Sequence, residues 1–144
     1  MWNRWVILAE SLPQDANFQF VFLAVSTTSD PLGSYYKFAF DIPEVPGDFF
    51  DYPQLGMSQD TLIITGNIFT GENYVRSRAF GIAKAAAYNG HGWSMPYFIL
   101  GTPGTVAPPI VEGNVGNAYL VAASPGLDPN NLKLLRKTLS VRTC

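Results

Sequence analysis

Carboxylates are the side chains most able to carry chemistry in this chain, because it contains 11 acidic residues but one histidine and one cysteine. Asp51 paired with Glu72, or with Glu112, would supply the two carboxyl groups that glycoside hydrolysis needs about 5 to 9 Å apart. A fragment of a carbohydrate-active hydrolase is therefore the alternative function that the sequence suggests. Few of the acidic residues fall in predicted strands, however, so the sequence favours a protein that is not an enzyme.

Other catalytic and metal sites lack the residues that they require. His91 would have to serve any catalytic triad, but it lies between glycines in the segment 89–93, which is typical of an exposed turn, and no Gly-x-Ser-x-Gly motif is present. One histidine and one cysteine cannot complete a zinc site. The spacing of Asp48, Asp51 and Asp60 does not match a calcium-binding loop. We therefore predict no catalytic residue, no metal and no cofactor.

The elements that would position these side chains are short β-strands. Aromatic and β-branched runs are separated by turns that use 13 glycines and 11 prolines, with turn signals at intervals of roughly 8 to 15 residues. Gly66 lies inside one of these runs and predicts a bulge or a close approach to the backbone. The predicted strands are 5–9, 18–25, 35–40, 54–58, 61–69, 78–82, 96–100, 109–112, 118–123 and 132–139, with a helical turn at 84–88.

An internal repeat organises these strands. Long β-runs at 4–10, 61–69 and 117–124 begin about 57 residues apart, and an apolar strand follows each of them. A four-stranded unit of roughly this length is typical of a propeller blade. We expect an all-β fold of antiparallel four-stranded meanders arranged as an incomplete β-propeller, with a two-sheet β-sandwich as the alternative. Residues 1–46 would form a partial blade, 47–101 a full blade and 102–144 a partial blade.

Three segments resemble a family as well as a fold. The stretches AVSTTSDPLGSYYKFAF (24–40), DYPQLGMSQDTLIITGN (51–67) and AFGIAK (79–84) are similar to motifs of the β-propeller repeat region of large secreted bacterial proteins of unknown function. The resemblance implies a fold and a secreted parent protein, but no reaction. The beginning of the chain has no signal-peptide pattern, and residues 2–8 already have the pattern of a strand, so we expect sequence upstream of them.

Propeller geometry predicts one binding site. The loops 48–52, 69–76 and 102–107 would meet on one face of the channel, where aromatic rings beside amide and charged groups suit a polar small molecule, a glycan or a peptide. The predicted ligand-binding residues are Asp51, Tyr52, Glu72, Asn73, Tyr74 and Arg76. The competing interpretation is that Tyr52 and Tyr74 serve packing.

Charge and hydropathy limit the kinds of partner that the chain is expected to bind. A net charge of −2 without a basic patch argues against nucleic acid, and no apolar run approaches the roughly 20 residues of a membrane span. An incomplete ring exposes strand edges and apolar faces, so we expect a homo-oligomer. The leading prediction is a non-enzymatic module that binds or scaffolds and assembles with further copies to close a ring. A purely structural homo-oligomer without a ligand is the third interpretation.

Overall fold

The computed structural model describes residues 3–12, 18–42, 45–109, 111, 113, 116–122 and the main chain of 123 and 132–137. The prediction of an all-β, antiparallel protein is confirmed. The elements in chain order are β1 (Val6–Glu10), β2 (Phe20–Ser26), β3 (Tyr35–Asp41), β4 (Asp48–Met57), β5 (Thr61–Thr70), β6 (Asn73–Ala83), α1 (Lys84–Tyr88), β7 (Tyr97–Ile99), β8 (Val106–Ala107), β9 (Ala118–Ala123) and β10 (Leu132–Lys137). No helix among these residues is long and apolar enough to cross a membrane.

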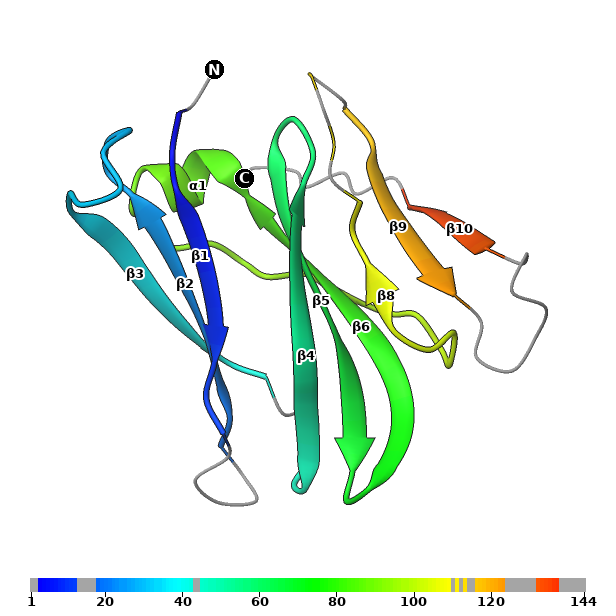
Figure 1. Ribbon diagram of the computed structural model, residues 1–144. Helices are drawn as coiled ribbons and strands as arrows, with labels where there is room; N and C mark the ends of the chain where they lie inside the picture. The colour runs from blue at the N-terminus through cyan, green and yellow to red at the C-terminus, as the bar shows by residue number, and fades with distance from the viewer. Residues whose placement is uncertain are drawn as a thin grey trace.

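The strands form three antiparallel meanders (Figure 1). The first sheet has the order β1-β2-β3, the central sheet β4-β5-β6-β7, and the third sheet β8-β9-β10. Neighbours in sequence are neighbours in each sheet, which is the arrangement of an antiparallel meander. Each sheet lies within one of the three segments that the repeat defined.

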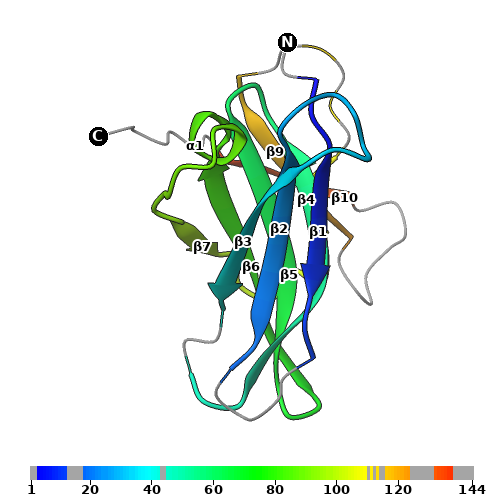
Figure 2. The ribbon, with the colours of Figure 1, turned by 90° about the vertical axis from the view of Figure 1, so that its left-hand side faces the viewer.

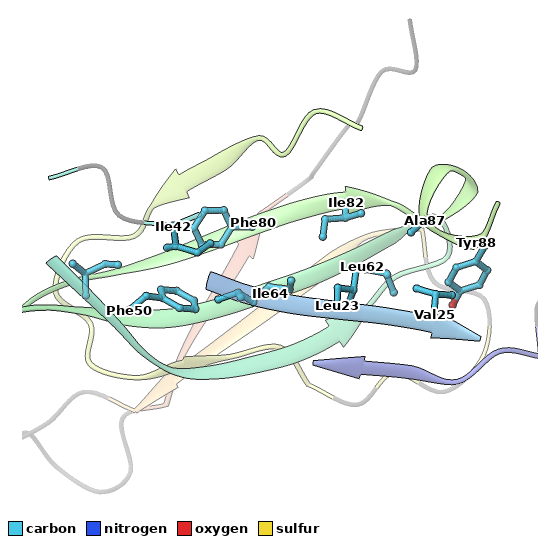
Figure 3. Close-up of a cluster of buried hydrophobic side chains, with 12 residues drawn as sticks. Leu23, Val25, Ile42, Phe50, Leu62, Ile64, Phe80, Ile82, Ala87 and Tyr88 are labelled. Atoms are coloured by element: carbon cyan, nitrogen blue, oxygen red, sulfur yellow. The ribbon is translucent and has the colours of Figure 1, made fainter. Parts of the chain in front are cut away.

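The first and central sheets pack face to face over the larger core (Figure 3). Alternation along β2 directs Val21, Leu23 and Val25 to this core, while the residues between them face away. The opposing side chains are Phe50 of β4, Leu62, Ile64 and Ile68 of β5, Phe80 and Ile82 of β6, and Ala87 and Tyr88 of α1. A polar link joins the same two sheets, because the Gln19 amide donates to the Phe50 carbonyl at 2.6 Å and accepts from the Phe50 N–H at 2.7 Å.

The other face of the central sheet packs on the third sheet. Ile63 and Ala79 contact Val106 and Leu120 in this second core. Strand β5 is therefore buried on both faces, which explains its continuous apolar run, because alternation is lost when both faces are covered. The Thr65 hydroxyl adds a hydrogen bond of 2.6 Å to the Val106 carbonyl.

Gly66 permits the close approach that its position in β5 predicted. A Cβ atom at this position would lie 2.3 Å from Cζ of Phe50, so any side chain would displace the aromatic ring. The ring of Phe50 also meets that of Phe80 edge to face, with centroids 5.7 Å apart. The glycine thus makes room for the Phe50 ring in the first core.

Several predicted boundaries are wrong. Strand β4 begins at Asp48 rather than at 54, and β6 begins at Asn73 rather than at 78. The ten-residue β5 offers a pairing partner along its whole length, and this pairing overrides the weak strand propensity of its neighbours. Pro53 is accommodated because it sits at a register shift between Asp51 and Gln54 on an edge strand.

The strand predicted at 109–112 is also wrong for the residues described there. Pro109 and Val111 lie outside any strand, and the pairing with β9 is made upstream by β8. Prolines at 108 and 109 cannot donate to a ladder, so pairing ends before them. Ile110 and Glu112 lie outside the described residues, as do 138–139 of the last predicted strand.

Contacts between strands of neighbouring sheets link the three sheets. Strand β1 lies beside β4, and β5 lies beside β8. In both cases a strand that contains one of the long β-runs, β1 or β5, lies next to the first strand of the following sheet, β4 or β8.

Candidate functional site

The predicted loops gather at the end of the β5–β6 hairpin, where an ion pair joins them. Arg76 Nη2 donates to Asp48 Oδ2 at 2.6 Å, and the Thr70 hydroxyl donates to Asp48 Oδ1 at 2.8 Å. Asp48 is buried at the start of β4. Arg76 therefore fastens β6 to β4 at this end.

Tyr74 is held by polar contacts of its own. Its hydroxyl lies 2.9 Å from Ser77 Oγ and accepts from the Gly104 N–H at 3.2 Å, while its ring meets Phe69 edge to face. Ser77 also donates to the Gly104 carbonyl at 2.7 Å. These bonds fix the segment that leads to β8, so the geometry favours a structural role for Tyr74.

The remaining predicted residues are spread along the central sheet. Asp51 pairs with Asn67, whereas Glu72 and Asn73 lie at the exposed tip of the hairpin. Glu72 lies beyond Thr70 and hence about 10 Å or more along the strand from Asp51. This arrangement does not bring Asp51 and Glu72 into the geometry of a hydrolytic pair, and Glu112 lies outside the described residues.

Tyr52 occupies a strained position. It is the only non-glycine residue with a positive φ in the described chain, at 55°, and its side chain is 60% exposed. A bulky residue rarely adopts this conformation, and here the register shift of β4 imposes it. The ring projects into solvent beside the bulge.

Asp51 faces a carboxylate that the sequence did not single out. Glu10 ends β1, and burial raises the pKa of its carboxyl, which the negative charge of Asp51 raises further. Glu10 Oε2 is buried without a hydrogen-bond partner among the described residues. Because β1 lies beside β4, tertiary packing alone brings the two acids near each other. No group of three or more His, Cys, Asp or Glu that could hold a metal occurs in the part of the chain described.

Glu10 should make stability depend on pH. Since its pKa is raised on folding, its favourable contribution is complete below its ordinary value of 4.5 and is lost as the pH rises through the folded value. Glu10→Gln is therefore expected to raise the melting temperature at pH 7 but not at pH 4. Differential scanning calorimetry at both pH values measures this, with the exposed Glu72→Gln as control. Equal gains at the two pH values would contradict it.

His91 and its neighbours form an exposed loop after α1. The His91 N–H donates to the Ala86 carbonyl at 3.0 Å, which closes the turn. The imidazole is exposed, and Gly90 has a φ of 70°. This matches the prediction of an exposed turn residue.

A cleft opens at the opposite end of the sheets, near α1 and the β4–β5 turn. It has a volume of about 610 Å³. The residues around it come from four distant segments: Arg4, Met57, Ser58, Gln59, Asp60, Lys84, Ala85, Tyr88, Val111 and Gly113. No sequence pattern could have found it, because these residues meet only in the folded chain.

Lys84 connects α1 to the β4–β5 turn at one wall of the cleft. Its ammonium donates to the Ser58 carbonyl and, at 3.5 Å, to the Gln59 carbonyl. Burial lowers the pKa of Lys84, although the Asp60 carboxylate opposes this shift. Asp60 Oδ1 in turn accepts from the hydroxyls of Ser58 and Thr61 at 3.1 and 3.0 Å.

The outer face of the first sheet is apolar on β1 and β2, whereas β3 adds the exposed Lys37 and Asp41 to it. Trp5 and Ile7 are each 52% exposed and Phe22 is 43% exposed, and they lie on the face that alternation turns away from the core. Phe18 and Phe20 extend the same face. Figure 2 views the molecule from this side, with β1, β2 and β3 in front of the central sheet and no described element over them.

Comparisons with protein-family models, curated proteins and solved structures find no significant match to this chain. The resemblance to the propeller repeat region therefore stays a prediction.

Proposed function

We propose that the chain is a non-enzymatic scaffolding module of the β-propeller type, and that further copies pack on the outer face of its first sheet to close a ring. The observation that carries the proposal is this apolar face, defined by Trp5, Ile7, Phe18, Phe20 and Phe22. Groups of exposed apolar side chains rimmed by polar residues often mark interaction sites, and here Lys37 and Asp41 of β3 form part of the rim.

The internal repeat supports the idea that another β-sheet packs on the outer face of the first sheet. In the central sheet, the face that packs on the first sheet carries Leu62 opposite Ile82 and Ile64 opposite Phe80. The outer face of the first sheet carries the equivalent pairs, with Ile7 opposite Ala24 and Ala9 opposite Phe22. Equivalent faces in repeat proteins accept equivalent neighbours, and a terminal repeat that needs no neighbour has a polar outer face.

A second copy can supply the missing layer through its third sheet. Ala118, Leu120 and Ala122 face the central sheet, so alternation places Tyr119 and Val121 on the opposite face of β9. If this face packs on the first sheet of another copy, the contact continues the stacking already seen between sheets. Two copies would contribute six sheets, within the four to eight blades of known propellers.

The predicted polar-ligand site receives less support than the scaffold. Arg76 is engaged with Asp48, and Tyr74 is engaged with Ser77 and Gly104. Asp51 lies away from the hairpin tip that carries Glu72 and Asn73. A scaffolding role needs none of these side chains to be free.

Cysteine cross-linking between copies tests the proposal. In a Cys144→Ser background, Ala9→Cys and Tyr119→Cys chains are prepared separately, mixed, refolded together and treated with a short bismaleimide. The proposal predicts a cross-linked pair containing one chain of each variant, and little product when Leu32→Cys replaces Ala9→Cys, because Leu32 lies in the turn after β2. Exclusive cross-linking of Ala9→Cys to itself, or no cross-link, would contradict it.

A further inference from the structure

Among the described residues that line the cleft beside α1, cations outnumber acids. Arg4 and Lys84 line it, and Asp60 is the one acidic residue among its described lining residues. The Asp60 carboxylate is already occupied on Oδ1 by two hydroxyls. A ligand entering this cleft would therefore meet two cations and a partly satisfied anion.

Arg4 supplies one of the two cations of the cleft. Its guanidinium makes no hydrogen bond or ion pair with any residue that the structure describes, although it lies close enough to Tyr88 to oppose the rise in the pKa of that phenol, which burial causes. A guanidinium presents a planar pair of N–H groups that matches a carboxylate or a phosphate. Its position at a cleft wall favours an acidic group as the ligand's charged end.

Lys84 can add one further donor. Two of its three N–H groups are directed at the carbonyls of Ser58 and Gln59, which leaves one without an acceptor among the described residues. The carbonyl contacts also hold the ammonium at the wall. Because burial disfavours its charge, a nearby anion would restore the stability of the charged form.

Part of the wall is apolar, and the cleft is larger than a single ion requires. Met57, Ala85 and Val111 provide aliphatic surface, and the volume of about 610 Å³ falls within the range of small-molecule sites. An inorganic ion would use only the charged end of this space.

We infer that the cleft binds a small organic anion, with its carboxylate or phosphate group on Arg4 and Lys84 and its apolar part against Met57 and Val111. This site is separate from the predicted polar-ligand residues, and it does not depend on the assembly proposed above. An apolar ligand body adds contact area that inorganic phosphate cannot make.

Titration calorimetry with benzoate, phenyl phosphate, inorganic phosphate and neutral benzyl alcohol tests the inference. Benzoate or phenyl phosphate is expected to bind more tightly than inorganic phosphate and benzyl alcohol. Arg4→Gln should weaken that binding at least about tenfold, because it removes a charge-assisted pair of hydrogen bonds. Met57→Glu, which adds a like charge to the exposed wall, should weaken it too, whereas Lys37→Gln on β3 should leave it unchanged.

Three results would overturn the inference. One is the absence of binding by both organic anions at millimolar concentration. Another is equal affinity for benzyl alcohol, which would show that the charged end contributes nothing. The third is undiminished affinity in Arg4→Gln while circular dichroism shows a native fold.

Discussion

Leu62→Ala is expected to lower the free energy of unfolding by about 2–5 kcal/mol. Leu62 has no exposed surface and lies near the start of β5, within the core between the first and central sheets. Its removal leaves a cavity that both sheets line, and a strand covered on two faces has little freedom to collapse into it. Urea denaturation followed by tryptophan fluorescence gives the change directly.

Leu32→Ala provides a matched control for this substitution. Leu32 loses the same atoms but is 93% exposed in the turn after β2, so a change within about 0.5 kcal/mol is expected. A similar loss of stability in the two variants would show that the core described here does not dominate the stability of the fold.

Asp48→Ala is the second substitution with a large expected effect, about 3 kcal/mol of destabilisation. It leaves the Arg76 guanidinium without its carboxylate and the Thr70 hydroxyl without its acceptor. Arg76 is only 19% exposed, so water can compensate for the lost partner only in part. Thermal and chemical denaturation of the variant at neutral pH measure the cost.

The exposed Asp41→Ala on β3 serves as the control for Asp48→Ala. It removes a carboxylate at the far edge of the first sheet, where a change within about 0.5 kcal/mol is expected. If Asp48→Ala lowers the free energy of unfolding as little as Asp41→Ala, the Asp48–Arg76 pair does not fasten β4 to β6. The end of the hairpin would then depend on backbone pairing alone.

The hydrophobic pattern of the sequence was enough to predict strands such as β2 and β5. Alternation in β2 and the apolar run in β5 each reflect how many faces are covered, and both strands were found close to their observed bounds. The helical turn at α1 was also predicted. These features depend mainly on the residues within the element itself.

Features that depend on neighbouring strands could not be predicted. Strand β4 extends back to Asp48 because β5 pairs with it, although Pro53 and the acidic residues around it suggest a loop. The weakly patterned β8 forms because β9 offers its edge. Both are cases in which tertiary pairing outweighs intrinsic preference.

The same distinction holds for the candidate sites: the sequence predicted which loops lie together, but not the contacts that their residues make. The repeat placed the loops of Tyr74 and Arg76 at one end of the sheet, but the sequence could not show that Ser77, Gly104 and Asp48 occupy their polar groups. Arg4 and Lys84 are 80 positions apart in the sequence, and no ligand-binding motif connects them. Only the packing of α1 near the β4–β5 turn brings them to one cleft.

The mass of the intact chain in solution tests assembly most directly. Light scattering at micromolar concentration should give a particle of two copies of the 15.8 kDa chain, which is the smallest closed ring that three sheets per copy allow. Phe22→Lys should shift the population toward single copies, because it places a charge on the face that another copy would cover. A monodisperse particle of 15.8 kDa over the whole micromolar range would contradict the account.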